Sequence, residues 1–231
     1  MNLLVVIPAR GGSKGIPKKN IKSLNGKPLI NYSIEIAKEL FPNNIICLST
    51  DDIEIKEIAE STGLEVPFIR PKELASDTAG TYEVLEHAVN FYDKNRGYKA
   101  DVVLLLQPTS PFRKIEQVRE AVKLYKDDLD LVLSVRESKA SPYFNLYEED
   151  QEGYLKKSKP HNYTRRQDCP IVWEANGAIY VINVKSMKEH KSISYNKVRK
   201  YVMDDYSSHD LDTMFDWDMA EMMLNHQLSK K

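Results

Sequence analysis

Leu3-Leu4-Val5-Val6-Ile7-Pro8 runs directly into Ala9-Arg10-Gly11-Gly12-Ser13-Lys14-Gly15, and this stretch decides the fold. Residues 3–7 form a short, continuous apolar run rich in β-branched side chains, the pattern of a strand that is buried on both faces. A basic, glycine-containing loop over residues 9–20 follows the run. Ligands of open α/β sheets bind at the carboxyl ends of the strands, so this loop lies where a ligand is expected.

The rest of the chain continues as alternating strands and helices. Apolar, β-branched runs predict further strands at residues 45–48, 65–69, 102–106, 129–135, 178–182 and 200–203. Apolar residues at helical spacing predict helices around 30–37, from a cap at Asp51 or Asp52 to 59, from Thr78 or Thr81 to 89, at 118–125 and at 214–228. Repeated strand–helix units imply right-handed crossovers, and therefore an α/β fold with a mostly parallel sheet flanked by helices.

The alternation breaks at about Glu137. From there to Val172 the chain is polar and aromatic, and no helical period persists. Two interpretations stay open, a small oligomerisation arm and a long surface excursion. We expect residues 1–136 and 173–231 to form one α/β domain and residues 137–172 to form a small extension.

Composition excludes several classes of protein. The formal net charge is −1, with 29% charged and 42% hydrophobic residues, so no global field attracts nucleic acid or a membrane surface. No stretch approaches the roughly 18 apolar residues of a membrane span, and the first apolar run lacks the basic start of a signal peptide. Cys47 and Cys169 lack zinc-site spacing, which predicts reduced thiols in a cytoplasmic protein.

The loop after the first strand is suited to a phosphorylated ligand. Arg10, Lys14, Lys18 and Lys19 place four positive charges within ten residues, matching the roughly four negative charges of a nucleoside triphosphate. The glycines let backbone N–H groups approach a phosphate closely. The spacing fits neither the dinucleotide-binding nor the P-loop motif, and a mobile, solvated turn is the alternative interpretation.

A second candidate lies in Ser207-Ser208-His209-Asp210-Leu211-Asp212. In extended backbone, residues two apart point the same way, so Asp210 and Asp212 can present two carboxylates to one cation. Mg²⁺ commonly takes one or two carboxylates together with substrate phosphates. The alternative is that both residues cap the next helix, whose first turn also carries Asp216 and Asp218.

Three further sites are ambiguous from the residues alone. Gln107, at the end of the strand at 102–106, could read a base edge or a sugar hydroxyl, or only bond its own loop. Arg165-Arg166-Gln167 could hold a carboxylate bidentately or be an exposed pair, and Arg70 is open in the same way.

Five segments, taken in order, resemble the acylneuraminate cytidylyltransferases, also called CMP-sialic acid synthetases. They are residues 9–17 with Lys19-Asn20, Ser49-Thr50-Asp51, residues 106–111, Arg165-Arg166-Gln167 with Asn176-Gly177-Ala178, and Asp210-Leu211-Asp212. The resemblance implies a Rossmann-like nucleotide-diphospho-sugar transferase fold and a homodimer joined through the extension. It implies CTP and a nonulosonic, sialic-acid-like sugar acid as substrates, and Mg²⁺ as cofactor.

The resemblance also implies roles for individual residues. Arg10, Lys19 and Arg166 are the expected catalytic residues, with Arg166 approaching the sugar acid from the extension. Substrate binding is expected from Ser13, Asn20, Arg70, Thr81, Gln107 and Gln167, and metal binding from Asp210 and Asp212. Thr81 stands near a serine of the family, and Glu174 stands where some bacterial members have arginine, so the preference among sugar acids does not carry over.

The implied reaction is in-line attack by the anomeric hydroxyl of the sugar acid on the α-phosphorus of CTP. Positioning and charge neutralisation supply most of the acceleration in such transfers. Two alternatives stay open. A metal-dependent glycosyltransferase could also use the Asp-x-Asp pair, and a non-catalytic nucleotide-binding module would need only the basic loop.

Overall fold

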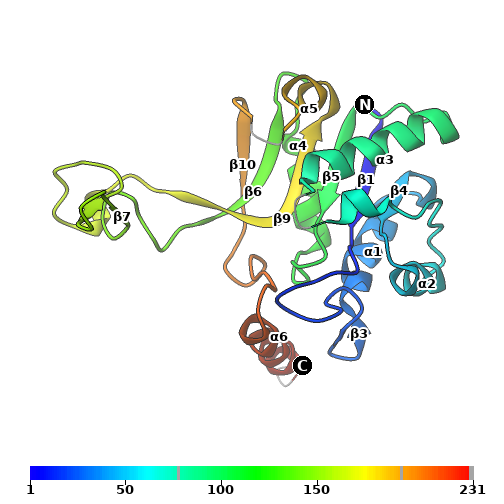
Figure 1. The fold of residues 1–231 in the computed structure, drawn as a ribbon, viewed down its shortest axis with the longest axis horizontal. Helices are drawn as coiled ribbons and strands as arrows, with labels where there is room; N and C mark the ends of the chain where they lie inside the picture. The colour runs from blue at the N-terminus through cyan, green and yellow to red at the C-terminus, as the bar shows by residue number, and fades with distance from the viewer. Residues whose placement is uncertain (77–78, 193–194, 229–231) are drawn as a thin grey trace.

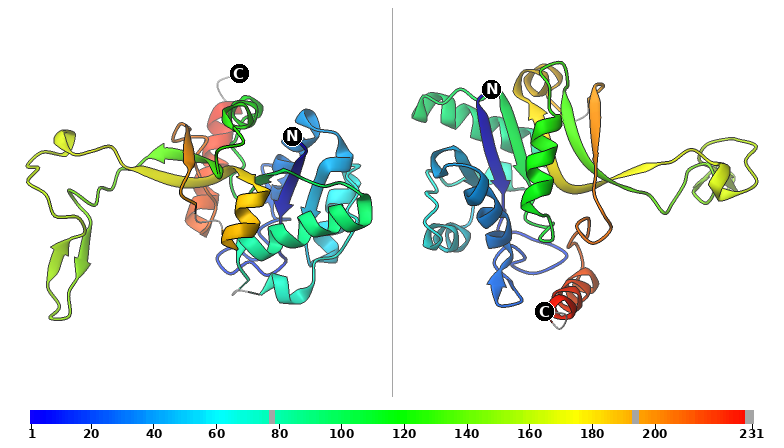
Figure 2. Two further views of the ribbon diagram at one scale, coloured as in Figure 1. Left: turned by 90° about the horizontal axis from the view of Figure 1, so that it is seen from above. Right: turned by 180° about the vertical axis from the view of Figure 1, so that it is seen from behind.

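The computed structural model describes residues 1–76, 79–192 and 195–228, and at its centre lies a sheet covered by helices on both faces (Figures 1 and 2). Within these residues, six strands form the main sheet. In spatial order they are β10 (Val198–Val202), β6 (Leu131–Glu137), β9 (Trp173–Asn183), β5 (Val102–Leu106), β1 (Leu3–Pro8) and β4 (Ile46–Ser49). Only β9 runs antiparallel to its neighbours, β5 and β6, so the predicted α/β fold with a mostly parallel sheet is confirmed.

The helices divide between the two faces of the sheet. Their bounds are α1 (Leu29–Leu40), α2 (Ile53–Ser61), α3 (Thr81–Arg96), α4 (Ile115–Leu124), α5 (Val184–His190) and α6 (Met214–Leu228). One apolar cluster joins the sheet to α1, α2 and α4, and includes Val5, Ile34 and Val118. A second cluster joins the opposite face to α3 and α5, and includes Leu85 and Met187. Among the described residues, every helix is too short or too polar to cross a bilayer.

The prediction of a strand at residues 65–69 is wrong. This segment is irregular, although Leu64 and Val66 are buried, and it is tied to the core by the Arg70 amide, which donates to the Thr50 carbonyl at 2.7 Å. Pro67 has no N–H to donate, which removes a ladder bond where the segment would extend the sheet beyond β4. Thr78, one of the two expected starts of α3, lies outside the described residues, and α3 begins at Thr81.

Several short elements were not predicted from the sequence. They are the hairpin of β2 (Ser23–Leu24) and β3 (Lys27–Pro28), the helix α5, and the 3₁₀ turns η1 (Asn43–Ile45) and η2 (Lys72–Ala75). The hairpin turn is Asn25-Gly26, with φ values of 50° and 78°, and α5 is capped by the Asn183 side chain, which accepts from two backbone amides. Both signals are present in the sequence, as a hairpin dipeptide and an N-cap residue.

The extension leaves the sheet between the end of β6 at Glu137 and the start of β9 at Trp173, and it projects away from the rest of the molecule (Figures 1 and 2). We call residues 138–172 the arm. It contains the hairpin of β7 (Tyr147–Glu149) and β8 (Leu155–Lys157) and the 3₁₀ turn η3 (Arg166–Asp168). Tyr154 and Leu155 are 66% and 67% exposed. Within one chain, these apolar side chains are left largely uncovered.

A third apolar cluster lies at the carboxyl edge of the parallel strands, where α6 packs beside the β2–β3 hairpin (Figure 1). It joins Ile16 of the basic loop, Leu211 of the acidic segment and Trp217 of α6, and all three are almost completely buried. Burial of such side chains stabilises their contact by about 1.5–3 kcal/mol each. This cluster therefore holds the basic loop and the acidic segment together.

Candidate active site

Two cavities meet at the carboxyl edge of the sheet. The first, of about 460 Å³, is the loop cavity, and its wall includes Arg10, Ser13, Lys14, Gly15, Lys19 and Asn20. The second, of about 490 Å³, is the neck cavity, and its wall includes Arg136, Glu174, Asn176, Gly177, Tyr180 and His209. Gln107, Asp210 and Asp212 line both cavities. These three residues therefore mark the place where two substrates can meet.

The basic loop and the acidic segment are in direct contact. The Lys19 ammonium donates to the Leu211 carbonyl at 2.6 Å and lies 3.3 Å from Asp212 Oδ1. A Cβ atom at Gly15 would overlap the backbone carbonyl oxygen of Asp212, so this position needs glycine for the close approach. Residues almost two hundred positions apart thus form one wall, and Arg10 and Asp212 share a cavity.

Two side chains brace the loop from behind, the buried Asn20 and the partly exposed Asp51. The Asn20 side-chain amide donates to the Arg10 carbonyl at 2.9 Å, and Asp51 Oδ1 accepts the Gly11 amide at 3.1 Å. Asp51 also accepts from Arg70 Nη2 at 3.3 Å. Burial lowers the pKa of Arg70, and the bond to Asp51 opposes that shift. Arg70 is 3% exposed and lines neither cavity, so its contact with the loop runs through Asp51.

The positive charge of the loop is not spread evenly. Arg10, Lys14 and Lys19 line the loop cavity, whereas the Lys18 ammonium turns outward to Glu54 Oε2 at 2.6 Å. The expectation that all four basic residues face the ligand is therefore wrong for Lys18. Its partner on α2 draws it away, and Lys18 itself adopts a left-handed backbone conformation with φ of 50°.

Asp210 and Asp212 face the cavities, and the helix cap is formed elsewhere. Asp216 Oδ2 accepts the Thr213 amide at 2.7 Å and the Asp212 amide at 3.2 Å, which is the contact expected of a first-turn acid. Asp210 Oδ1 instead accepts from the Ser110 hydroxyl at 3.3 Å. Burial and the nearby charge of Asp212 raise the pKa of Asp210, and the charge of Lys19 and the hydrogen bond from Ser110 oppose the shift.

The acidic pair fits a cation that is shared with phosphate. No group of three or more His, Cys, Asp and Glu side chains suited to a metal gathers within the described residues. A cage made by protein alone is therefore not present there, whereas Mg²⁺ commonly takes one or two carboxylates and completes its shell with phosphate and water oxygens. Asp210 and Asp212 supply those carboxylates on the cavity wall. A cation there would also offset the cost of burying the charge on Asp210.

A buried arginine that was missed in the sequence lies beneath the shared residues. Arg113 Nη2 donates to Ser33 Oγ at 2.6 Å and to the Gln107 carbonyl at 3.3 Å, and Nη1 donates to the Ala178 carbonyl. Burial lowers the pKa of Arg113 to about 9, and the charge of Asp210 opposes the shift, so the side chain stays protonated at pH 7. Arg113 thereby ties the residue that follows β5 to the middle of β9 and keeps a positive charge below the shared residues.

A buried polar network positions the acidic segment. The Asn176 amide donates to Ser208 Oγ at 2.8 Å, and its oxygen accepts from Ser134 Oγ at 2.6 Å, next to the irregularity in the pairing of β6 with β9. Gly177 follows in the left-handed region with φ of 73°, beside Asp210 and Gln107. Because its members satisfy one another, the network fixes the segment that precedes Asp210.

With this geometry in place, the comparison with known proteins is decisive. Residues 4–224 match the family model described as cytidylyltransferase. The chain belongs to the cytidylyltransferase family. It is 36% identical to a CMP-N,N'-diacetyllegionaminic acid synthase of Legionella pneumophila, over 97% of both chains. It is 34% identical to an N-acylneuraminate cytidylyltransferase of Streptococcus agalactiae, over 94% of this chain and 52% of the relative.

A solved structure supports the same fold for this cytidylyltransferase. The CMP:2-keto-3-deoxy-manno-octonic acid synthetase complexed with CTP aligns with a TM-score of 0.71 at 18% identity, covering 98% of this chain and 100% of the other. At that identity the likeness concerns the fold alone. The resemblance to acylneuraminate cytidylyltransferases that the sequence motifs indicated is confirmed by the family model and the curated relatives.

Besides Arg70, three predicted site residues lie away from both cavities of the cytidylyltransferase. Thr81 is the first residue of α3, and Arg166 and Gln167 lie in η3 of the arm. Arg166 Nη2 donates to the Lys139 carbonyl at 2.7 Å, and both η3 residues line a separate cavity of about 350 Å³ at the base of the arm. A single chain therefore does not bring Arg166 to the basic loop.

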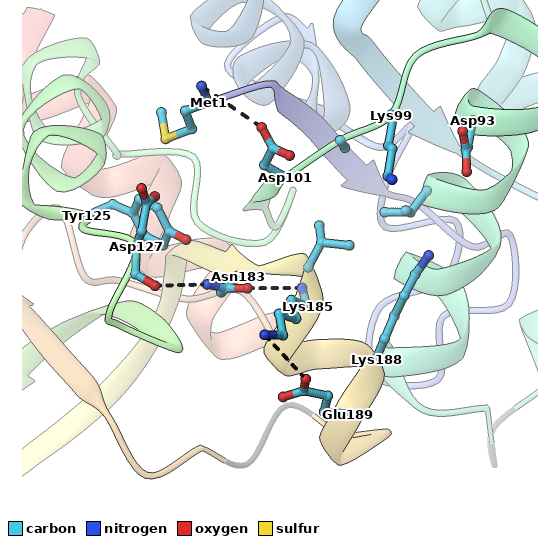
Figure 3. Close-up of a pocket in the computed structure, with 13 residues that line it drawn as sticks. Met1, Asp93, Lys99, Asp101, Tyr125, Asp127, Asn183, Lys185, Lys188 and Glu189 are labelled. Atoms are coloured by element: carbon cyan, nitrogen blue, oxygen red, sulfur yellow. Dashed lines mark hydrogen bonds and ion pairs between the residues drawn. The ribbon is translucent and has the colours of Figure 1, made fainter.

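A larger cavity, of about 770 Å³, lies at the opposite end of the sheet (Figure 3). It opens beside Asp101, at the start of β5, and Asn183, at the end of the antiparallel β9. Its polar groups bond one another, since Lys185 lies 3.9 Å from Glu189 and the Asn183 amide donates to the Asp127 carbonyl (Figure 3). Ligands of such sheets bind at the other edge, so the pair of cavities around Asp210 is the candidate active site.

Proposed function

We propose that this protein transfers the cytidylyl group of CTP to the anomeric hydroxyl of a nonulosonic, sialic-acid-like sugar acid and releases pyrophosphate. The observation that carries the proposal is that two polar cavities share Gln107, Asp210 and Asp212, one with a basic loop and one without. The loop cavity suits the triphosphate, and the neck cavity suits the sugar acid. The relatives named above for CMP-legionaminic acid and N-acylneuraminate chemistry support this choice of substrates.

The reaction is one in-line displacement. The anomeric oxygen forms a bond to the α-phosphorus, the bond from that phosphorus to the bridging oxygen of pyrophosphate breaks, and the hydroxyl proton leaves. Arg10, Lys14 and Lys19 balance the negative charge of the triphosphate, and Gln107 orients the groups that meet between the cavities. Such positioning and charge balance account for most of the acceleration in transfers of this kind.

Asp210 is the group best suited to accept the proton. It lies where the two cavities meet, so its carboxylate is a proton acceptor beside the place where the two substrates would join. Asp210 and Asp212 would also hold Mg²⁺, which when bound supplies positive charge against the charge that develops on pyrophosphate.

The arm extends the proposal to a cytoplasmic homodimer. Exposed apolar residues such as Tyr154 and Leu155 need a partner surface, and a second copy would supply it. In the dimer, Arg166 and Gln167 of one subunit would approach the neck cavity of the other, with the Arg166 guanidinium positioned to bind the sugar carboxylate. A cytoplasmic location is supported by the free thiols of Cys47 and Cys169, since thiols stay reduced in that compartment.

Pyrophosphate release tests the proposal directly. The purified protein is incubated with CTP and Mg²⁺ and with N-acetylneuraminate, its deaminated analogue, legionaminate or pseudaminate in turn. We expect pyrophosphate and a CMP-sugar in equal amounts, only when a sugar acid is present. Absence of pyrophosphate with every acid and every nucleoside triphosphate would overturn the proposal. Release of a nucleotide from a nucleotide sugar would indicate a glycosyltransferase, and CTP binding indifferent to Mg²⁺ without turnover would indicate a binding module.

A further inference from the structure

An ion pair on the wall of the neck cavity has no part in the chemistry described so far. Arg136 lies near the end of β6 and pairs in register with Glu174 at the start of β9, and Arg136 Nη2 lies 2.8 Å from Glu174 Oε1. Both side chains line the neck cavity, and neither lines the loop cavity. Their side chains are 36% and 44% exposed, so a ligand in the neck cavity can contact both.

The pair is not needed to hold two elements together. β6 and β9 are already joined by backbone pairing on both sides of it, from Val135–Ala175 to Glu137–Trp173. Ion pairs with this exposure contribute little to stability, typically about 0–1 kcal/mol. A role in ligand contact therefore explains its position better than a role in folding.

The chemistry of the pair points to a neutral group. Arg136 uses one of its five N–H donors on Glu174, and it bonds no other acceptor within the part of the chain that the structure describes. Glu174 retains free acceptor capacity, and the charges of the two side chains offset one another. The pair thus presents hydrogen-bond donors and acceptors side by side, with no net charge to attract a carboxylate.

Its place along the strand indicates which part of a sugar acid it meets. Gly177 adjoins Asp210 and Gln107 at the reaction centre, and Glu174 precedes it by three residues. Three residues of fully extended chain span at most about 10 Å. The anomeric carbon and its carboxylate must lie at the reaction centre, so the ion pair faces the opposite end of the sugar.

We propose that Arg136 and Glu174 form a specificity-determining pair that recognises an N-acyl substituent on the sugar acid at the end remote from the anomeric carbon. An N-acyl group carries one N–H donor beside one carbonyl acceptor. The N–H donates to Glu174 and the carbonyl accepts from Arg136, so both halves of the pair are used. A hydroxyl in the same place is a single group and cannot contact both side chains in the same way. This inference rests on the proposed function, because it assigns the substrate's substituents at the same site.

Selectivity between two acids tests the pair. We compare kcat/KM for N-acetylneuraminate and for its deaminated analogue, with N,N'-diacetyllegionaminate as a third acid. For the wild type we expect kcat/KM to be about tenfold higher for the N-acylated acids than for the deaminated acid, because the deaminated acid loses one hydrogen bond to a charged group. Glu174→Gln and Arg136→Gln should each remove most of that ratio and leave the KM for CTP unchanged. Glu60→Gln breaks an exposed pair with Lys56 on α2, away from both cavities, and should leave the ratio as in the wild type.

A charge exchange separates recognition from structure. Arg136→Glu combined with Glu174→Arg re-forms the ion pair, so its thermal stability should match that of the wild type, but donor and acceptor are exchanged and the selectivity should stay lost. The inference is overturned if the single variants keep the wild-type ratio of kcat/KM values, or if the charge exchange restores that ratio. In either case, turnover of CTP by the wild type still upholds the proposed function. No turnover of any acid by the wild type overturns both.

Discussion

The body of the molecule and its arm use their residues in opposite ways. In the body, Ile16, Leu211 and Trp217 are buried together, and they bring the basic loop against the acidic segment within one chain. In the arm, Tyr154 and Leu155 are mostly exposed, and Arg166 faces a cavity of its own. The comparison teaches that the wall of the loop cavity is completed within one chain, whereas the apolar side chains of the arm stay mostly exposed in that chain.

The largest expected effect is a loss of chemistry in the body. Asp212→Asn removes a carboxylate from the wall shared by both cavities, and turnover should fall about 100- to 1000-fold because charge on the leaving pyrophosphate is less well neutralised. CTP binding, measured by calorimetry, should weaken much less. Asp218→Asn alters an exposed acid of α6 that lines neither cavity and is the matched control. Unchanged turnover of Asp212→Asn at saturating Mg²⁺ would exclude the metal-ligand role.

The next effect tests whether the arm serves a second subunit. Arg166→Ala should lower turnover about 10- to 100-fold through the loss of a guanidinium–carboxylate contact. Mixing Arg166→Ala with Asp212→Asn should restore about a quarter of wild-type activity, because half of the dimers are mixed and each has one intact site.

The neighbouring arginine supplies the control for that experiment. Arg165 bonds Asp168 within the arm at 2.8 Å, so Arg165→Ala should keep nearly full activity. Failure of the mixture to recover activity, with exchange of subunits verified by mass, would mean that Arg166 does not act across a dimer.

A smaller effect, on stability, tests the close approach of the basic loop to the acidic segment. Gly15→Ala places a methyl group against the Asp212 carbonyl and should lower the free energy of unfolding by about 2 kcal/mol or more. Gly12 has open space around its Cα, so Gly12→Ala should change that free energy by less than about 0.5 kcal/mol. Urea denaturation of both variants gives the comparison, and equal stability of the two would contradict the close approach.

The smallest effect on folding is expected in the arm. Leu155→Ser changes a side chain that is 67% exposed in the single chain, so the free energy of unfolding of the body should change by less than about 0.5 kcal/mol. Sedimentation should nevertheless show weaker dimerisation at micromolar protein concentration. If the wild type is a stable monomer, this prediction is contradicted. The arm would then be a long surface excursion that serves no dimer.

The sequence predicted the central strands and α6 well for a physical reason. β5 is a run of five apolar residues buried on both faces, so no other element competes for it, and α6 has the predicted bounds of 214–228. The edge of the sheet beyond β4 was harder to predict. The segment at 65–69 has the composition of a strand, but Pro67 prevents the pairing. Asn25-Gly26 and Asn183 were local signals for the missed hairpin and for α5, and both could have been used.

The site was predictable where its residues lie in one segment and much less so where the fold supplies the partners. The residues of the basic loop and the Asp210/Asp212 pair were identified because each group lies within a few positions along the chain. Asp51 and Arg113 carry no spacing pattern that reveals their contacts with Gly11 and Gln107. Arginine is seldom fully buried, and only the packed structure shows that Arg113 is.

The contact of Lys19 with Leu211 has a consequence for synthesis on the ribosome. The strands from β1 to β6 can begin to assemble while translation continues, but the nucleotide cavity lacks a wall until residues 210–217 have left the exit tunnel. A nascent chain stalled before Leu211 should therefore fail to retain CTP on a filter, whereas one released from the tunnel through Leu228 should retain it. The wall of the loop cavity is thus completed by a segment that is translated long after the basic loop.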